Sequence, residues 1–379
     1  MRLVPAALGK SIRSVTGPPL SLACESLGSL PMVKLHTMKW FFALVLLLLQ
    51  ASHSGTALVA SAQSPAKPVA NSEEHLRGIE LYREKKYAEA VKLLRKAVKK
   101  NATDGQSWYY LGLSLLHQPK EMKEASKAFE TVLKLQPNSA AAHTGLSYSL
   151  LFRNKSSDAL REAKTALSLE PNLPDAHYVI GVVRLREDKQ DDALAEANTA
   201  IKLNPEFPSG YLLKSQALVR FYRDVLVEKR DETSEERTNR FTEAADALEK
   251  YLQLEPTAKD KQSWTEQLES LRFYSHRTVN GIEGVFSVKQ VTTKARVLSK
   301  PEPAYTEDAR RTQVIGTVVL RAVFTAEGTV RHFLVIQGLP HGLTEAAISA
   351  ARKIKFSPAA IDGRPVSMFI QLEYNFNLY

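Results

Sequence analysis

The middle of the chain repeats one pattern of apolar and polar residues, and each copy has the period of an amphipathic helix. Similar sequence segments end at Pro137, Pro171 and Pro205, which are spaced at a constant interval (171 − 137 = 205 − 171 = 34). A fourth copy closes at Pro256, after one and a half such intervals (256 − 205 = 51). A period of 34 with a proline after a helix is typical of stacked helix pairs. The pattern therefore predicts an all-α solenoid.

Small residues recur with the same period, and they let the two helices of a pair approach closely. An alanine stands at one constant offset before each of the four prolines. An earlier, degenerate repeat lacks the closing proline but keeps small residues. Because proline has no N–H and disfavours a helix at the residue before it, each proline is expected to end a helix. The residues expected to shape the repeats, besides the prolines, are Gly78, Ala90, Trp108, Ala125, Ala159, Gly181, Ala193 and Ala244.

The repeats are predicted to occupy residues 72–277. The extra residues of the last repeat lie within 221–240 and are dense in charge, so they are expected to lengthen a helix and add a mobile loop. An amphipathic pattern at 258–277 predicts a further helix, which would cap the last apolar face of the solenoid.

A second pattern, with a period of two residues, begins after residue 295. It predicts a strand at 316–325, a turn at 326–328 and a second strand at 329–337. A short helix at 306–311 and a small-residue helix at 343–354 accompany them, and a final strand follows at 366–378. The fold class predicted for the whole chain is therefore multidomain: an all-α solenoid, a linker at 278–295, and a small α+β domain at 296–379. That domain is expected to be an antiparallel sheet with two helices.

The beginning of the chain predicts export. Lys39 precedes an apolar run at 40–49, and small residues follow as far as Ala62. The run is shorter than the about 20 residues of a spanning helix, so a cleaved signal peptide at 38–62 is favoured over a retained anchor at 40–62. Residues 1–37 are interpreted as a non-native or disordered leader, and 63–71 as a tether. The location expected is the periplasm, or the inner membrane if the helix stays uncleaved.

Composition excludes some classes of function. The net charge of +10 comes from Lys and Arg that are spread next to Glu and Asp, so no nucleic-acid interface is expected. Cys24 precedes the signal segment, so a mature chain would have no cysteine for disulfides, thiol catalysis or metal binding. No catalytic residues, metal or cofactor are predicted, because His332, His341, Glu345 and Asp362 do not have the spacing of an acid–base or ligand set.

Residues 72–256 resemble the tetratricopeptide repeat family. The resemblance implies that the concave face of the array binds an extended or helical peptide. A rigid spacer, or a platform for self-association such as a homodimer, is an equally open interpretation.

The last domain resembles the C-terminal domain of TonB-type energy transducers. The matching motifs include Ala309-Arg310, Gly316-Thr317-Val318, Phe356-Ser357-Pro358-Ala359 and Gly363-Arg364-Pro365-Val366. Thr306 stands where the family has a proline after the tyrosine. The family's long proline-rich spacer is absent, with repeats in its place, and the apolar run at 40–49 lacks the Ser-x-x-x-His spacing of the family's membrane anchor.

The resemblance implies that the last strand binds a segment of an outer-membrane transporter by strand addition. Two hypotheses follow: a TonB-like protein in TonB-dependent transmembrane transport, or a periplasmic scaffold or adaptor without energy coupling. The strand is also expected to pack the core through its other face. The candidate partner-binding residues are Tyr305, Ser367, Phe369, Gln371, Glu373 and Asn375.

Overall fold

The computed structural model describes residues 72–227, 234–258, 260–276 and 284–378. The predicted leader, signal segment and tether lie outside these residues, as does the loop predicted within the insert.

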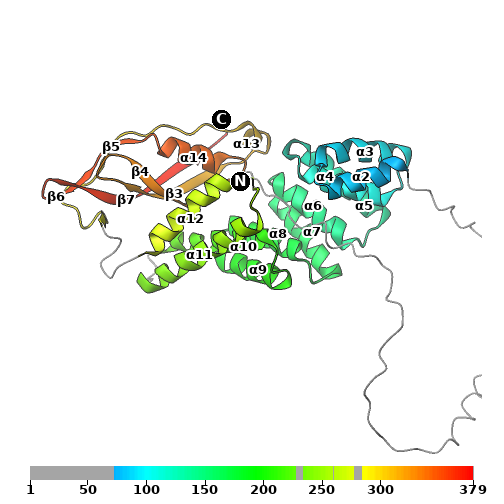
Figure 1. Cartoon of the computed structure of the whole chain (residues 1–379), viewed down its shortest axis with the longest axis horizontal. Helices are drawn as coiled ribbons and strands as arrows, with labels where there is room; N and C mark the ends of the chain where they lie inside the picture. Colours follow the sequence, from blue (N-terminus) through cyan, green and yellow to red (C-terminus); the bar gives the residue numbers. More distant parts are fainter. Residues whose placement is uncertain (1–71, 228–233, 259, 277–283, 379) are drawn as a thin grey trace, which may run out of the picture. The chain divides into compact units, whose positions relative to one another are not determined.

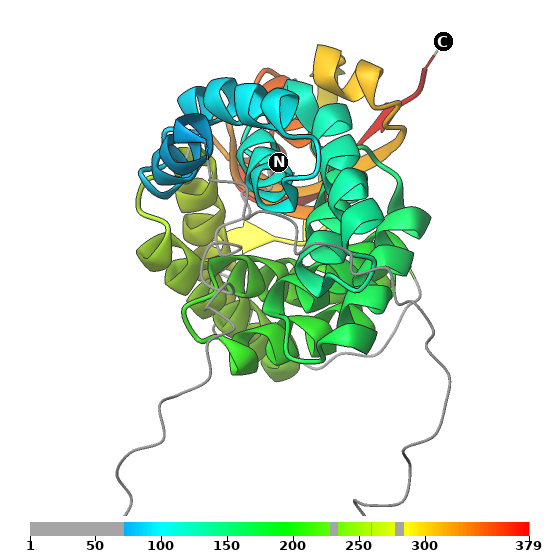
Figure 2. The same cartoon turned by 90° about the vertical axis from the view of Figure 1, so that its right-hand side faces the viewer.

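Helices pair along the first part of the described chain, as the period of the sequence predicts (Figure 1). Successive pairs follow one another along a curve (Figure 2). A 3₁₀ turn, η1 (Pro119–Glu121), precedes α5. The paired helices are α2 (Glu73–Arg83) with α3 (Tyr87–Lys100), α4 (Gly105–Leu116) with α5 (Met122–Leu135), α6 (Ala140–Phe152) with α7 (Ser156–Leu169), α8 (Pro174–Arg186) with α9 (Gln190–Leu203), and α10 (Pro208–Val227) with α11 (Ser234–Leu254).

The residues predicted to shape the repeats lie beyond helix ends or between helices. Pro137, Pro171, Pro205 and Pro256 each stand two residues beyond the end of a helix. A Cβ atom on Gly78 would lie 2.7 Å from Leu94 Cγ, and the indole of Trp108 donates to the carbonyl of Ala102. A Cβ on Gly181 would lie 2.5 Å from Leu213 Cδ2. The alanines that are 0% exposed between helices are Ala90, Ala125, Ala159, Ala193 and Ala244.

The insert lengthens both helices of the last pair, since α10 has 20 residues and α11 has 21. Helix α12 (Lys261–Ser275) follows where the capping helix is predicted.

The C-terminal domain is a sheet with two short helices, α13 (Glu307–Arg311) and α14 (Leu343–Ala351). The strands are β1 (Val285–Phe286), β2 (Arg296–Ser299), β3 (Gly316–Phe324), β4 (Val330–Gln337), β5 (Lys355–Ser357), β6 (Ala359–Ile361) and β7 (Arg364–Phe376). The main sheet has the order β1-β7-β3-β4, and β6 also pairs with β7. The three long strands pair antiparallel, as predicted, and the structure puts them in the order β7-β3-β4, while β2 pairs separately with β5.

The segment predicted as a linker also enters the sheet. Val285 and Phe286 pair in parallel with Ser367 and Met368, and Thr293 forms a bridge to Ala360. Strand β1 has only two residues, which are too few to show a period in the sequence.

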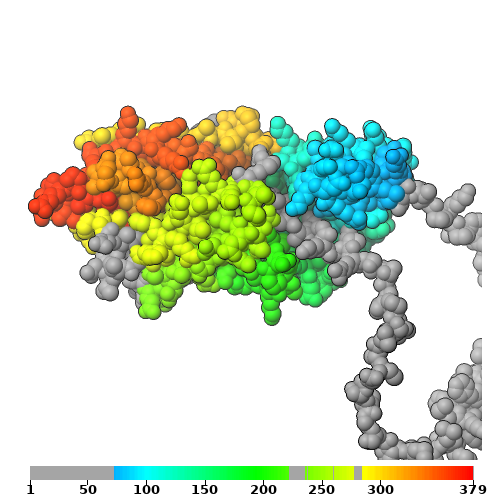
Figure 3. Space-filling model, viewed as in Figure 1, coloured from blue at the N-terminus to red at the C-terminus, as the bar shows by residue number. Residues whose placement is uncertain are grey.

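Both faces of the sheet are covered. Val318, Leu320 and Phe324 pack against α13 and α14 in one core. On the other face, Val319 and Leu334 join Leu271 of α12 in a second core with residues of α10 and α11. Figure 3 shows the last helices of the repeats and the sheet domain as one continuous surface. Residues 72–379 accordingly fall within one compact unit, and the apolar face that α12 was predicted to cap is continued by the sheet.

Candidate functional site

The C-terminal half of β7 is an edge of the sheet. Before it, Arg364–Val366 pair with β6, and Ser367 and Met368 pair with β1. From Phe369 to Phe376, the only strand partner within the described residues is β3. An edge of this kind presents a row of backbone N–H and C=O groups to another chain.

One contact shows which backbone groups face outward. Lys300 Nζ donates to the carbonyl oxygen of Glu373 at 2.6 Å, and the same nitrogen lies 4.4 Å from the centre of the Tyr374 ring. Backbone groups of successive residues in an antiparallel strand turn alternately toward and away from the partner strand. The backbone groups of Gln371, Glu373 and Asn375 therefore turn away from β3. A lysine beside such an edge protects it from unselective pairing.

Three of the predicted partner-binding side chains are exposed at this edge: Gln371, Glu373 and Asn375. Gln371 Nε2 donates to Glu373 Oε1 at 2.8 Å, and Thr317 Oγ1 donates to Asn375 Oδ1 at 2.7 Å. These polar side chains keep the edge soluble, and they can exchange their bonds for bonds to a partner.

The other three candidates are only partly exposed, and each contacts another element of the chain. The Tyr305 hydroxyl donates to the carbonyl of Val314, and the Tyr305 ring lies edge-on to Phe376 at 5.8 Å. Ser367 Oγ accepts from the N–H of Ala326 at 3.2 Å. Phe369 packs in the core shared with α12, and the guanidinium of Arg321 lies 4.5 Å from the centre of its ring. Strand alternation places Phe369 on one face with Gln371 and Glu373, but only the tertiary structure puts helices over that part of the face.

The opposite edge of the sheet, β4, is closed by α12. Gln267 Nε2 donates to the carbonyl of Phe333, and Gln267 Oε1 accepts from the N–H of Val335, both at 3.0 Å. The Tyr274 hydroxyl donates to the carbonyl of His332 at 3.0 Å. The side-chain amide thus takes the place of a neighbouring strand, which leaves β7 as the available edge of the described sheet.

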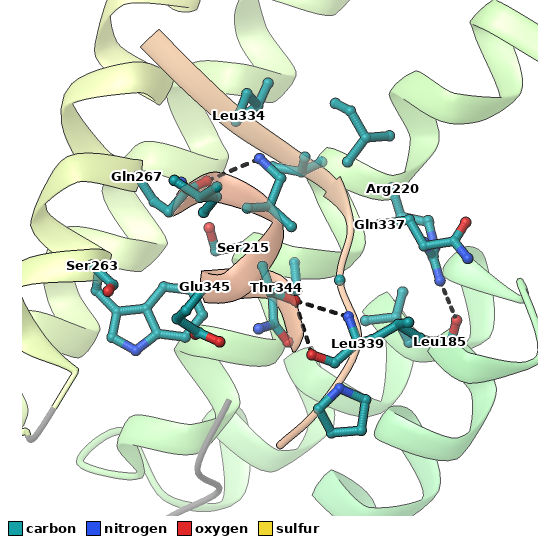
Figure 4. A pocket seen from close by; sticks show the side chains of 18 of the residues that line it. Leu185, Ser215, Arg220, Ser263, Gln267, Leu334, Gln337, Leu339, Thr344 and Glu345 are labelled. Carbon is teal, nitrogen blue, oxygen red and sulfur yellow. Dashed lines mark hydrogen bonds between the residues drawn. The ribbon is translucent and has the colours of Figure 1, made fainter. Parts of the chain in front are cut away.

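A pocket of about 590 Å³ lies where α8, α10 and α12 meet β4 and α14 (Figure 4). Its walls combine apolar residues with amides, hydroxyls and charged groups. Thr344 Oγ1 fixes the loop at its rim, because it both donates to and accepts from the backbone of Leu339, at 2.9 and 2.8 Å. Figure 4 shows Arg220 and Gln337 on one side and Glu345 on the other. The pocket was not predicted. Its one signal in the sequence is that Arg186 and Arg220 stand one repeat apart.

The histidines and acids whose spacing predicts no acid–base or ligand set have different surroundings in the structure. His332 stacks on Phe273 with ring centres 3.8 Å apart, and burial lowers its pKa. Burial lowers the pKa of His341 to about 4, and its ring lies edge-on to Phe152 at 4.9 Å. Glu345 lines the pocket, and Asp362 lies in a turn before β7. Among the described residues, no group of three or more His, Cys, Asp or Glu is placed to hold a metal ion.

Comparison with known families agrees with this architecture. Residues 301–378 match the family model of the C-terminal region of the Gram-negative bacterial TonB protein. Residues 75–140 and 144–211 match a tetratricopeptide repeat model. The chain carries tetratricopeptide repeats followed by a TonB C-terminal domain. Both resemblances are confirmed, and β7 is the last strand of the TonB C-terminal domain. Both families are protein-interaction domains, so the chain has a protein-interaction role in an envelope-associated setting.

Three solved structures are similar to about half of the chain. One is TTC0263, a thermophilic tetratricopeptide-repeat protein of Thermus thermophilus, which is 20% identical with a TM-score of 0.41 over 54% of this chain and 99% of that one. A MamA protein is 18% identical with a TM-score of 0.34, over 49% and 90% of the two chains. YrrB, described as a tetratricopeptide-repeat protein with an unusual peptide-binding site, is 17% identical with a TM-score of 0.33, over 50% and 88%.

No curated protein matches the chain significantly. Within the described part of the chain, no helix has the length and apolarity to cross a membrane.

Proposed function

We propose that this protein is a non-enzymatic, exported envelope protein whose TonB C-terminal domain binds a segment of an outer-membrane transporter in TonB-dependent transport. The segment adds as a strand beside Phe369–Phe376, and the tetratricopeptide repeats bind a further peptide of an envelope protein. The observation that carries the proposal is the asymmetry of the sheet: α12 closes the β4 edge, while β7 offers outward backbone groups at Gln371, Glu373 and Asn375. Main-chain pairing gives affinity, and the exposed side chains of β7 give selectivity.

The test uses a photo-crosslinking residue at Asn375 of the full chain in its native Gram-negative host. Gln371→Pro removes an N–H that faces away from β3, so the β3–β7 ladder keeps its bonds while the added strand loses one. Gln371→Ala keeps the N–H and is the matched control. Circular dichroism establishes that both variants are folded.

A crosslink to an outer-membrane transporter is expected with the parent chain and with Gln371→Ala, and a loss of at least about tenfold with Gln371→Pro. Equal crosslinking in both variants would rule out strand addition, and no transporter crosslink would rule out this partner.

The alternative is a periplasmic scaffold or adaptor without energy coupling. It is favoured by the apolar run at 40–49, which lacks the Ser-x-x-x-His of transducer anchors. Mass spectrometry of the protein from cells separates the two. A mature terminus near Gln63 supports the adaptor, because a cleaved chain has no anchor through which force could act. An intact anchor at 40–62 supports coupling.

A further inference from the structure

Two arginines one repeat apart hold equivalent positions in the array. Arg220 Nη2 donates to the carbonyl of Leu185 at 3.2 Å, at the end of the preceding α8. Arg186 Nη1 donates in the same way to the carbonyl of Leu151, at the end of α6, at 3.3 Å. Both arginine–carbonyl pairs have the same separation in sequence, so each guanidinium stabilises the C-terminus of the first helix of the preceding repeat.

The charges of the two arginines are balanced differently. Arg220 forms an ion pair with Asp188 at 3.2 Å. The position one repeat before Asp188 is Asn154, which has the same left-handed backbone, with φ of 61° against 57°. Asparagine carries no charge, and no acid of the described residues forms an ion pair with Arg186, whose other bond is to Ser156 Oγ at 3.2 Å. Burial also lowers the pKa of Arg186, to about 10.

Arg186, Asn154 and Ser156 all line the pocket of about 590 Å³. This volume is within the range of small-molecule sites, which are mostly apolar with a few polar groups that fix orientation. Apolar walls come from Leu185 and Leu339 among others, and the pocket's arginine beside α14, Arg352, is already paired with Glu266. A guanidinium prefers a carboxylate, which it can bind through two parallel hydrogen bonds.

We propose that this pocket binds a small organic acid, whose carboxylate pairs with Arg186 as the carboxylate of Asp188 pairs with Arg220. The apolar body of the acid lies against Leu185 and Leu339. Because the pocket is lined by both the repeats and the TonB C-terminal domain, the bound acid stabilises their junction. This inference is independent of the proposed strand addition at β7.

Isothermal titration calorimetry of the full chain with octanoate and with octanamide tests the proposal, because the two compounds differ in charge and share their apolar body. We expect octanoate to bind at least about tenfold more tightly and to raise the melting temperature increasingly as its concentration exceeds Kd. Arg186→Gln and Asn154→Asp are each expected to abolish the preference for octanoate. The first removes the positive charge, and the second supplies a carboxylate within the chain that pairs with Arg186.

Asn138→Asp is the matched control, since Asn138 is exposed in another turn of the repeats, outside the pocket lining, and the substitution adds the same charge. Asn154→Asp keeps the test valid if Arg186→Gln fails to fold, because aspartate accepts the left-handed backbone of this exposed turn. The proposal is overturned if neither compound binds, if octanamide binds as tightly as octanoate, or if Asn138→Asp weakens octanoate binding as much as Asn154→Asp.

Discussion

Asp175 is a buried acid that lies among aromatic side chains of the repeats. It lies in the first turn of α8, directly after Pro174, and is 8% exposed. The Tyr148 hydroxyl donates to Asp175 Oδ1 at 3.0 Å, and the Tyr148 ring lies 5.8 Å from that of Tyr178. Burial raises the pKa of Asp175 to about 6, against the lowering effect of the Tyr148 hydrogen bond. The charged form is therefore disfavoured in the folded protein.

The raised pKa of Asp175 determines how the stability of the protein depends on pH. The folded pKa of Asp175 is above the unfolded value of 3.8. Its contribution to the free energy of unfolding therefore falls as pH rises from about 4 to about 6 and is constant above that. The loss is on the order of 3 kcal/mol. Asp175→Asn is expected to remove this loss of stability. The free energies of unfolding measured with urea at pH 4 and pH 7.5 should then differ less than in the parent chain.

Tyr148→Phe is the companion variant. It removes the hydrogen bond that lowers the pKa of Asp175, so the loss of stability should extend to higher pH. An unchanged pH profile in Asp175→Asn would contradict the assignment of this loss to Asp175.

The two edges of the sheet differ at the scale of elements. The β7 edge is open to a partner, whereas the β4 edge is bound by a helix through Gln267, which is 8% exposed. A buried backbone group that loses its only partner costs more than the net energy of a hydrogen bond. The helix that was predicted to cap the solenoid, α12, therefore also closes the β4 edge of the sheet.

Replacing Gln267 with leucine should destabilise the protein. The change leaves the carbonyl of Phe333 and the N–H of Val335 buried without this partner, at a cost of about 2–4 kcal/mol in the free energy of unfolding. Urea denaturation measures the change. Gln262→Leu is the control, because Gln262 is exposed on the same helix. Equal effects of the two substitutions would show that Gln267 does not act by closing the edge.

Much of this element-level structure could be predicted from the sequence. The prolines, alanines and strand alternation located the repeats and the three long strands, because these signals depend on local geometry. The short strands β1, β2, β5 and β6 could not be predicted, since two to four residues carry no period. Of the candidate site residues, Phe369 is covered by contacts with residues far away along the chain, such as Arg321, which no local pattern contains.

The repeats and the TonB C-terminal domain behave as one body at the scale of the whole molecule. A core of residues from α10, α11, α12, β3, β4 and β7 joins them. Interfaces between independent domains are usually more polar than this. A shared apolar core is expected to make the two regions unfold together.

Calorimetry is expected to show one cooperative transition for residues 72–379 of the parent chain. Leu334, 1% exposed in the shared core, is the residue to change. Leu334→Asp buries a charge at the junction and should separate the melting of the two regions into two transitions. Leu298→Asp, at a side chain that is 62% exposed, should leave the single transition in place. Two transitions in the parent chain would contradict the shared core.

The sequence by itself determined the two families, the order of the domains, the positions of most helices and the three long strands, because periodicity and turn residues act over short distances along the chain. The tertiary structure alone decided what covers each face and edge of the sheet. It placed α12 on β4, left the last residues of β7 open, and brought Arg186 of the repeats into one pocket with the loop after β4. Those contacts join residues far apart in sequence, and their energies arise from shape and burial that only the folded chain creates.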